Sequence, residues 1–250
     1  MTSIGTGYDL SASTYSPDGR IFQVEYADKA VENSGTAIGL RCTDGVVLAI
    51  ENLVPSKLLV PGSNCRTQSV DFHIGIAPAG LQADGRHLVT RARDEAAQWR
   101  STYKSRIGGK ALAERIANYT QAYTLYSSVR PFGASVIMGT VDDEGPQLYM
   151  IDPAGQYNGY RGVAIGKGKQ VAKTEIEKLN FQTLTCRQAV REAARILHVV
   201  HDEAKDKDFE LELTWVCTES KGKHAKVPAD VVAEAEQFAK QALNPDEMED

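Results

Sequence analysis

The stretch 16–33 constrains the fold more strongly than any other part of the sequence. It predicts a turn, in which Pro17 fixes φ and Gly19 tolerates any backbone angle, and then a helix that Asp18 can cap. A helix on a protein surface normally shows a single apolar stripe. This helix instead carries two apolar rows, Phe22 with Tyr26 and Ala30, and Val24 with Ala27 and Val31. We therefore expect burial on two sides, and a second chain is a candidate for one of them.

The composition indicates one globular domain over residues 1–250. Apolar and charged contents are ordinary, and layered α/β folds reach this length as a single unit. The net charge of −5, without a cluster of Lys and Arg, argues against a nucleic-acid partner. No apolar run approaches the ~20 residues of a membrane helix, and the first residues lack a targeting pattern. We expect a soluble protein with no membrane partner.

The four cysteines, Cys42, Cys65, Cys186 and Cys217, are scattered along the chain. The absence of a Cys-x-x-Cys pair argues against a zinc ribbon or a thioredoxin-type motif. Reduced thiols in a cytoplasmic and nuclear protein are the simplest interpretation. We expect neither a cofactor nor a metal.

Strand-like runs joined by turn signals predict antiparallel sheets. The predicted strands are 36–42, 46–50, 70–77, 134–140, 147–151, 156–162 and 209–216. Asp44-Gly45 turns the first hairpin, and 143–145 turns the second. Pro78 should end the strand before it, because proline cannot donate to a central ladder. The last run alternates, which is typical of a half-buried strand.

Apolar residues spaced three and four apart predict the helices. These are the segment 17–33, then 88–103, 112–126, 168–179, a helix starting at Thr185, and 231–242. Pro245 should stop the last helix, and 244–250 form an acidic tip. The element order is helix, strands, two helices, strands, two helices, strand, helix. Two antiparallel sheets packed face to face, with helices outside each, use all these elements.

Three local patterns could suggest a chemical site, but each is better interpreted as structural. The run 166–169, Gly-Lys-Gly-Lys, lacks the spacing of a phosphate loop and favours a strand-to-helix turn. His198 and His201, with Asp202, do not match a zinc spacing and favour a partly buried helix end. Ser135 does not lie in a nucleophile elbow.

Thr36 is the remaining candidate nucleophile. If cleavage exposed it as an N-terminus, its own α-amine could act as the base. That chemistry would also need a Lys and an Asp nearby to tune the amine and the hydroxyl.

The motif Ser-Pro-Asp-Gly-Arg-Ile-Phe-Gln-Val-Glu-Tyr-Ala at 16–27 resembles the signature of proteasome α-type subunits. The resemblance continues along the whole chain, and the eukaryotic seventh α-type group is the most similar kind. Further matching motifs are Gly45-Val-Val, Gly80-Leu81 with Ala83-Asp84, Arg130-Pro-Phe-Gly133, 148–153 and 173–178. The resemblance implies an α+β fold, a four-layer αββα sandwich of two antiparallel sheets like that of N-terminal-nucleophile hydrolases.

The same resemblance bears on catalysis. Alignment with catalytic β-type subunits puts Gly35 at the nucleophile, Glu51 at the aspartate and Arg66 at the lysine. Gly35 has no side chain with which to attack. The resemblance therefore implies a non-catalytic structural and gating subunit of the 20S outer ring, acting in ubiquitin-dependent protein degradation. A self-processing N-terminal threonine hydrolase is the alternative.

In this family the N-terminal tail, here residues 1–15, covers the pore. The family's gate cluster carries over onto Tyr8, Asp9, Pro17 and Tyr26. Many relatives follow Tyr-Asp with Arg, whereas this chain has Leu10. We therefore expect its tail to contribute less to the closed gate.

The resemblance also implies partners: adjacent α-type subunits, the β-type ring, and C-terminal tails of the regulatory particle or other activators. The helix would support ring assembly through Phe22, Val24, Ala27 and Val31. Activator tails dock by a carboxylate at a family lysine beside a Gly-Leu pair, which matches Arg66, Gly80 and Leu81. Arginine keeps the positive charge but changes the geometry. The acidic tip either contacts basic partners or solubilises the chain end.

Overall fold

The computed structural model describes residues 7–60, 62–201 and 208–243. The strands of the first sheet are β1 (Ala37–Arg41), β2 (Gly45–Leu53), β8 (Gly162–Ile165), β9 (Phe209–Cys217) and β10 (Ala225–Lys226). Those of the second sheet are β3 (Gln68–Asp71), β4 (Ile74–Gly80), β5 (Ala134–Asp142), β6 (Gly145–Ile151) and β7 (Tyr157–Gly159). The helices are α1 (Phe22–Glu32), α2 (Gln82–Tyr103), α3 (Gly109–Ala122), α4 (Lys169–Glu177), α5 (Cys186–Val200) and α6 (Ala229–Leu243).

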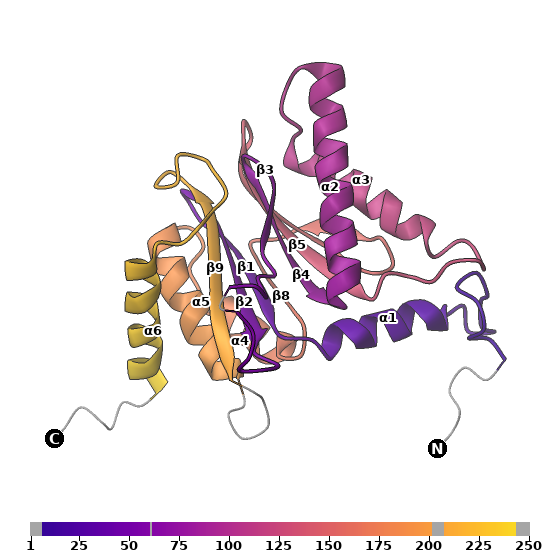
Figure 1. The fold of residues 1–250 in the computed structure, drawn as a ribbon, viewed down its shortest axis with the longest axis horizontal. Coiled ribbons are helices and arrows are strands. Elements are labelled where there is room, and N and C mark those ends of the chain that lie inside the picture. The colour runs from indigo at the N-terminus through magenta and orange to yellow at the C-terminus, as the bar shows by residue number, and fades with distance from the viewer. Residues whose placement is uncertain (1–6, 61, 202–207, 244–250) are drawn as a thin grey trace.

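The two sheets pack face to face, with helices on the outside of each (Figure 1). Their strand orders are β10-β9-β2-β1-β8 and β3-β4-β5-β6-β7, and every pairing is antiparallel. Helices α4, α5 and α6 cover the first sheet, and α2 and α3 cover the second. The predicted four-layer αββα sandwich is confirmed, and so is its element order, except that the short strand β10 between β9 and α6 was not predicted.

Alternation along the strands builds the core in separate layers. On β2, Val47 and Ala49 pack toward the helices, whereas Val46, Leu48 and Ile50 pack against the other sheet. Successive side chains of a strand point to opposite faces, so one apolar strand serves both layers. The prediction of a half-buried strand at 209–216 was wrong, because both faces of this strand are covered. Strand β9 is buried on both faces from Glu212 onward, because the second sheet covers its inner face.

Two further strand predictions need correction. The run 70–77 contains the end of β3, a turn and most of β4, and Pro78 lies inside β4, opposite Val136 of β5. Strand β3 pairs with β4 only as far as Ile76. No neighbouring strand on that side therefore requires a hydrogen bond from the main-chain nitrogen of Pro78, which has no hydrogen to donate. The run 156–162 contains β7 in one sheet and the start of β8 in the other, because the chain crosses between sheets after Gly159.

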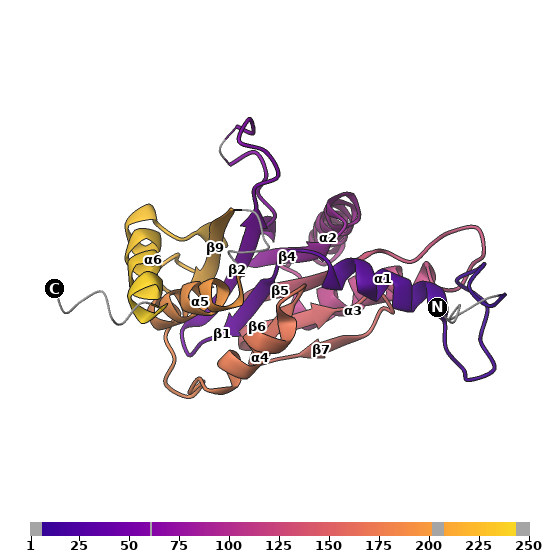
Figure 2. The same cartoon turned by 90° about the horizontal axis from the view of Figure 1, so that it is seen from below.

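The helices form where predicted, with shifted ends. Thr185 caps α5 in a capping box with Gln188. Asp18 does not cap α1, because the helix starts later, after Ile21, and that N-terminus has no side-chain cap. Helix α1 packs on β4 and β5 and extends past the sandwich toward the N-terminal segment (Figure 2). Of the helices in the described ranges, none has the length and apolarity needed to cross a membrane.

Candidate functional site

Gly35 leaves no room for a nucleophilic side chain. A Cβ atom added to it would lie 2.4 Å from the main-chain oxygen of Glu51. Thr36, the next residue, is fully buried: its N–H donates to Glu51 Oε2 at 3.0 Å, and its hydroxyl accepts from the Gly168 N–H at 3.1 Å. This geometry does not favour the self-processing hydrolase.

Glu51 and Arg66, which align with the catalytic aspartate and lysine, each bind another residue of this chain. Glu51 is buried, and its Oε1 lies 2.7 Å from Nδ1 of His201 at the end of α5. Arg66 donates its main-chain N–H to Glu212 Oε2 at 2.9 Å, and its side chain reaches a surface pocket. Burial lowers the pKa of the Arg66 guanidinium, and the charges of Glu212 and Glu51 offset part of that effect.

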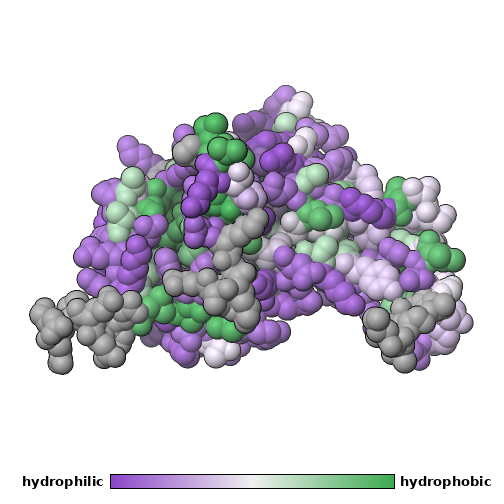
Figure 3. Space-filling view, turned by 60° about the horizontal axis from the view of Figure 1, so that its bottom comes forward, coloured by the Kyte–Doolittle hydropathy of each residue, from purple (hydrophilic) through white to green (hydrophobic). Residues whose placement is uncertain are grey.

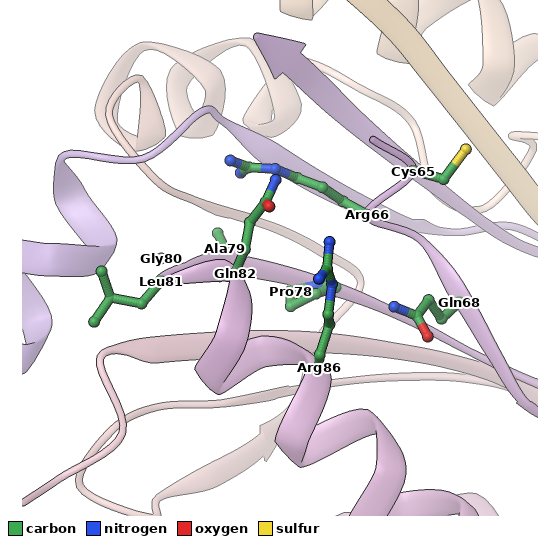
Figure 4. A pocket seen from close by; sticks show the side chains of 9 residues that line it. All are labelled: Cys65, Arg66, Gln68, Pro78, Ala79, Gly80, Leu81, Gln82 and Arg86. Carbon is green, nitrogen blue, oxygen red and sulfur yellow. The ribbon is translucent and has the colours of Figure 1, made fainter. Parts of the chain in front are cut away.

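The three predicted docking residues line one pocket, between the start of α2 and the segment before β3 that carries Arg66 (Figure 4). The pocket is lined by Cys65, Arg66, Gln68, Pro78, Ala79, Gly80, Leu81, Gln82 and Arg86. Gln82 and Arg86 rise from α2 toward the segment that carries Arg66, whereas Leu81 points away from them (Figure 4). Neither Asp nor Glu occurs among these lining residues, so Arg66 and Arg86 are the charged side chains that line the pocket.

Gly80 and Gly133 fix the backbone next to this pocket. Gly80 has φ of +115°, and a Cβ on it would lie 2.2 Å from the Gly133 oxygen, which accepts the Leu81 N–H at 2.8 Å. A Cβ on Gly133 would lie 2.9 Å from Leu81 Cδ1 and 3.5 Å from Ala30 Cβ on α1. Leu81 of the pocket and Ala30 of α1 therefore pack against the same glycine.

The described part of the N-terminal tail is tied to α1. The Tyr26 hydroxyl donates to Asp9 Oδ2 at 3.2 Å, and the Gln23 amide donates to the Asp9 main-chain oxygen. Burial, and then the hydrogen bond to Asp9, raise the pKa of Tyr26. The structure thus joins Asp9 and Tyr26 directly, while Tyr8 and Pro17 are exposed.

The turn before α1 has the predicted form. Gly19 adopts φ of +76° and donates to the Ser16 oxygen at 2.9 Å across Pro17 and Asp18. Arg20 then pairs with Glu25 in the first turn of α1, with Nε 2.6 Å from Oε1. Pro17 therefore stands at the apex of a hydrogen-bonded turn between tail and helix.

The four positions predicted for ring assembly divide between two sides of α1. Phe22, Ala27 and Val31 are buried within this chain. Val24 is partly exposed and lines a surface groove with Tyr15 and Leu125, among others. Burial of one side of α1 by its own chain is confirmed, and the contact of the Val24 side with a second chain stays a prediction.

Large apolar side chains are also exposed on the loop after β2. Leu58 and Val60 are 94% and 72% exposed. On the face shown in Figure 3, hydrophobic residues form separate groups within a mainly hydrophilic surface.

The patterns interpreted as structural have structural partners. Ser135 is buried in β5 opposite Ala79, and Lys169 pairs with Glu32 of α1 at 2.7 Å. The rings of His198 and Phe209 pack edge to face with their centres 5.0 Å apart. Asp202 and the acidic tip 244–250 lie outside the described residues.

Sequence reasoning missed the second arginine of the pocket and a clamp beside it. Arg86 follows Gln82, the residue after the Gly80-Leu81 pair, by four residues, so the helical periodicity of α2 could have indicated it. In the clamp, Arg130 binds Asp84 through both terminal nitrogens. Both residues lie in motifs noted above, but their pairing depends on the fold.

Comparisons with known proteins agree with these features. Residues 31–216 match the family described as "Proteasome subunit", and residues 8–30 match the N-terminal signature of its A-type members. The chain is 62% identical to an alpha type-3 proteasome subunit from Acanthamoeba castellanii, over 98% of this chain and 97% of that one. It is 57% identical to the alpha type-3 subunit of Arabidopsis thaliana, over 97% and 98% of the two chains. A probable alpha type-7 subunit of Schizosaccharomyces pombe is 55% identical, over 99% and 97%.

The N-terminal signature covers Asp9, Tyr26 and the Pro17 turn, and the larger match covers most of the sandwich, as far as β9, and the blocked nucleophile position. The chain therefore belongs to the proteasome subunit family, as a non-catalytic α-type subunit of the outer ring of the 20S core particle.

Proposed function

We propose that this subunit supports ring assembly through α1, gates substrate entry through its tail, and docks activators at the Arg66 pocket. Its partners are the adjacent α-type subunits, the β-type ring, and the C-terminal tails of the regulatory particle or other activators. It acts in the cytoplasm and the nucleus, in ubiquitin-dependent protein degradation.

The two sides of α1 support the role in ring assembly. Its inner side is anchored by Val31 in the core between the sheets, so its outer side is held in a defined position. The groove beside Val24 and the exposed Leu58 and Val60 offer apolar area that a neighbouring subunit would bury. Because these apolar residues form separate groups on the surface, they are consistent with contacts to more than one neighbouring subunit around a ring.

The link between Asp9 and Tyr26 supports the gating role. It fixes where the tail leaves α1, and the turn at Pro17 sets the direction of the connection. Leu10 is 89% exposed and cannot form the ion pair of an arginine at that place. Deleting residues 1–7 should therefore open the pore less than deleting the tail of an Arg-bearing neighbour. Peptide hydrolysis by latent particles measures this, and equal opening would contradict it.

One observation carries the docking role: the pocket and α1 meet at Gly133. A terminal carboxylate bound by Arg66 and Arg86 would lie beside Gly80 and Leu81. Because Leu81 and Ala30 pack on the same glycine, a shift of the Gly80–Leu81 segment would reach α1 and the tail attached to it.

Cross-linking of an activator tail peptide to this subunit in assembled particles tests the docking role. The peptide with a free carboxylate should cross-link, and the same peptide with an amidated end should not. Arg66→Glu should abolish cross-linking to this subunit, whereas Lys240→Glu on α6, a matched charge change, should leave it intact. Equal cross-linking of the amidated peptide, or of Arg66→Glu particles, would refute the proposal.

A further inference from the structure

Three of the four cysteines converge in the core beside the first sheet. Cys42 follows β1, Cys186 begins α5 and Cys217 ends β9, and their exposed fractions are 4%, 0% and 1%. The Cys42 sulfur, the Cys186 sulfur and a carboxylate oxygen of Asp44 all lie within 4.8 Å of one another. The Cys217 thiol interacts with Cys186. Their sequence spacing gave no indication of this cluster, because the ligands come from separate elements.

Hydrogen bonds donated by main-chain N–H groups hold the cluster together. Cys42 N–H donates to the Gly45 oxygen at 2.7 Å, which closes the hairpin turn around Asp44. Cys186 N–H, in the first turn of α5, donates to Asp44 Oδ1 at 2.8 Å. Cys217 pairs with Gly45 across β2 and β9. The hairpin, the helix start and the strand end are therefore fixed relative to one another before any ligand binds.

We propose that Cys42, Asp44 and Cys186 form a binding site for a thiophilic divalent cation such as Zn²⁺. Two sulfur atoms and one carboxylate oxygen are ligands that Zn²⁺ accepts, and a water molecule would complete a tetrahedral shell. Cys217 is not a ligand in this proposal. Its thiol can donate a hydrogen bond to the Cys186 sulfur without binding the ion. Asp44 is partly exposed, so the ion enters from the hairpin side.

The cation site has a defined proton balance. Zn²⁺ binds cysteine as the thiolate, so binding one ion to Cys42 and Cys186 releases the two thiol protons to solvent. The affinity should therefore rise with pH.

Titration of the purified full-length chain with Zn²⁺, and with Cd²⁺ as a spectroscopic probe, tests this. We expect one ion per chain, a thiolate-to-Cd²⁺ charge-transfer band, release of two protons and a rise in melting temperature. Cys65→Ser is the matched control, since Cys65 lies outside the cluster, and it should bind like the unmodified chain. Cys186→Ser and Cys42→Ser should each lose the band.

The variant Asp44→Asn distinguishes the loss of metal binding from misfolding. Asparagine keeps an oxygen that can accept the Cys186 N–H but removes the charged ligand. This variant should remain folded by circular dichroism and bind Zn²⁺ at least tenfold more weakly. Unchanged affinity in folded Asp44→Asn, the absence of proton release, or loss of the band in Cys65→Ser would each overturn the site.

Discussion

The carboxylate of Asp84 binds both terminal nitrogens of Arg130, at 2.6 and 2.9 Å. The same carboxylate accepts the Gly133 N–H at 2.9 Å. The hydrogen bond from Arg130, and then that from Gly133, lower the pKa of Asp84, so the pair is ionised at neutral pH. One buried side chain in the first turn of α2 therefore holds the turn 130–133, on which both Leu81 and Ala30 pack.

Replacing Asp84 should cost more stability than replacing its partner. Asp84→Ala leaves the Gly133 N–H without its acceptor and should lower the free energy of unfolding by about 2–3 kcal/mol. Arg130→Ala should cost about 1 kcal/mol, because the Arg130 side chain is 62% exposed. Urea unfolding of the isolated chain measures both values.

Arg187→Ala provides the control for this comparison. Arg187 also binds a carboxylate, that of Glu219, through two nitrogens, but both side chains are exposed. Its loss should cost less than about 1 kcal/mol. If Asp84→Ala and Arg187→Ala were equally mild, the Asp84 clamp would have no special structural role.

The arrangement of layers could be predicted from the sequence because apolar periodicity reports directly on local structure. The hairpin at Asp44-Gly45, the capping residue Thr185 and the paired helices 88–103 and 112–126 all depend on residues close together in the chain. The resemblance supplied the positions of the pocket, and the fold brings Arg66 to Gly80 and Leu81.

The failures share one cause, which is dependence on distant parts of the chain. Pro78 is tolerated inside β4 because β3 is too short to reach it. Strand β9 is buried on both faces from Glu212 onward because another sheet covers the face that its alternation left polar. Arg86 joins the pocket, and Cys186 meets Cys42, only through tertiary packing.

Gly35→Thr should not create a peptidase. The new Cβ would lie 2.4 Å from the Glu51 oxygen, so the strand must shift, and we expect a loss of at least about 2 kcal/mol. Mass spectrometry should find the chain uncleaved before residue 35. Gly108→Ala, whose added Cβ would meet only Asp142 Oδ2 at 3.6 Å, should be nearly neutral. Processing at residue 35 in the threonine variant would contradict this expectation.

Acid should destabilise the fold through His224. Its ring packs on Gly75, its Nδ1 lies 2.7 Å from the Ser69 hydroxyl, and burial lowers its pKa to about 4. The unfolded chain binds a proton at this histidine near pH 6.5, whereas the folded chain binds it only near pH 4. Protonation between these two values therefore favours the unfolded state. Stability should fall as the pH drops from 6.5 to 4, by about 3 kcal/mol at full protonation.

Unfolding of His224→Gln across that pH range isolates this contribution. The variant loses the titrating ring and should show a flatter dependence of unfolding free energy on pH than the unmodified chain. His87→Gln, which changes an exposed histidine, should retain the full slope. Equal slopes for His224→Gln and the unmodified chain would rule out His224 as the source.

A pair of substitutions on α1 separates ring assembly from folding. Val31 is 6% exposed in the core between the sheets, so Val31→Asp should cost the isolated chain more than about 3 kcal/mol. Val24 lies at the groove on the other side of α1, so Val24→Asp should change monomer stability by less than about 1 kcal/mol. A charge there would nevertheless be buried against a neighbouring subunit, so incorporation into rings, measured by native mass spectrometry, should fall sharply. Normal incorporation of a stably folded Val24→Asp chain would mean that α1 contacts only its own sandwich.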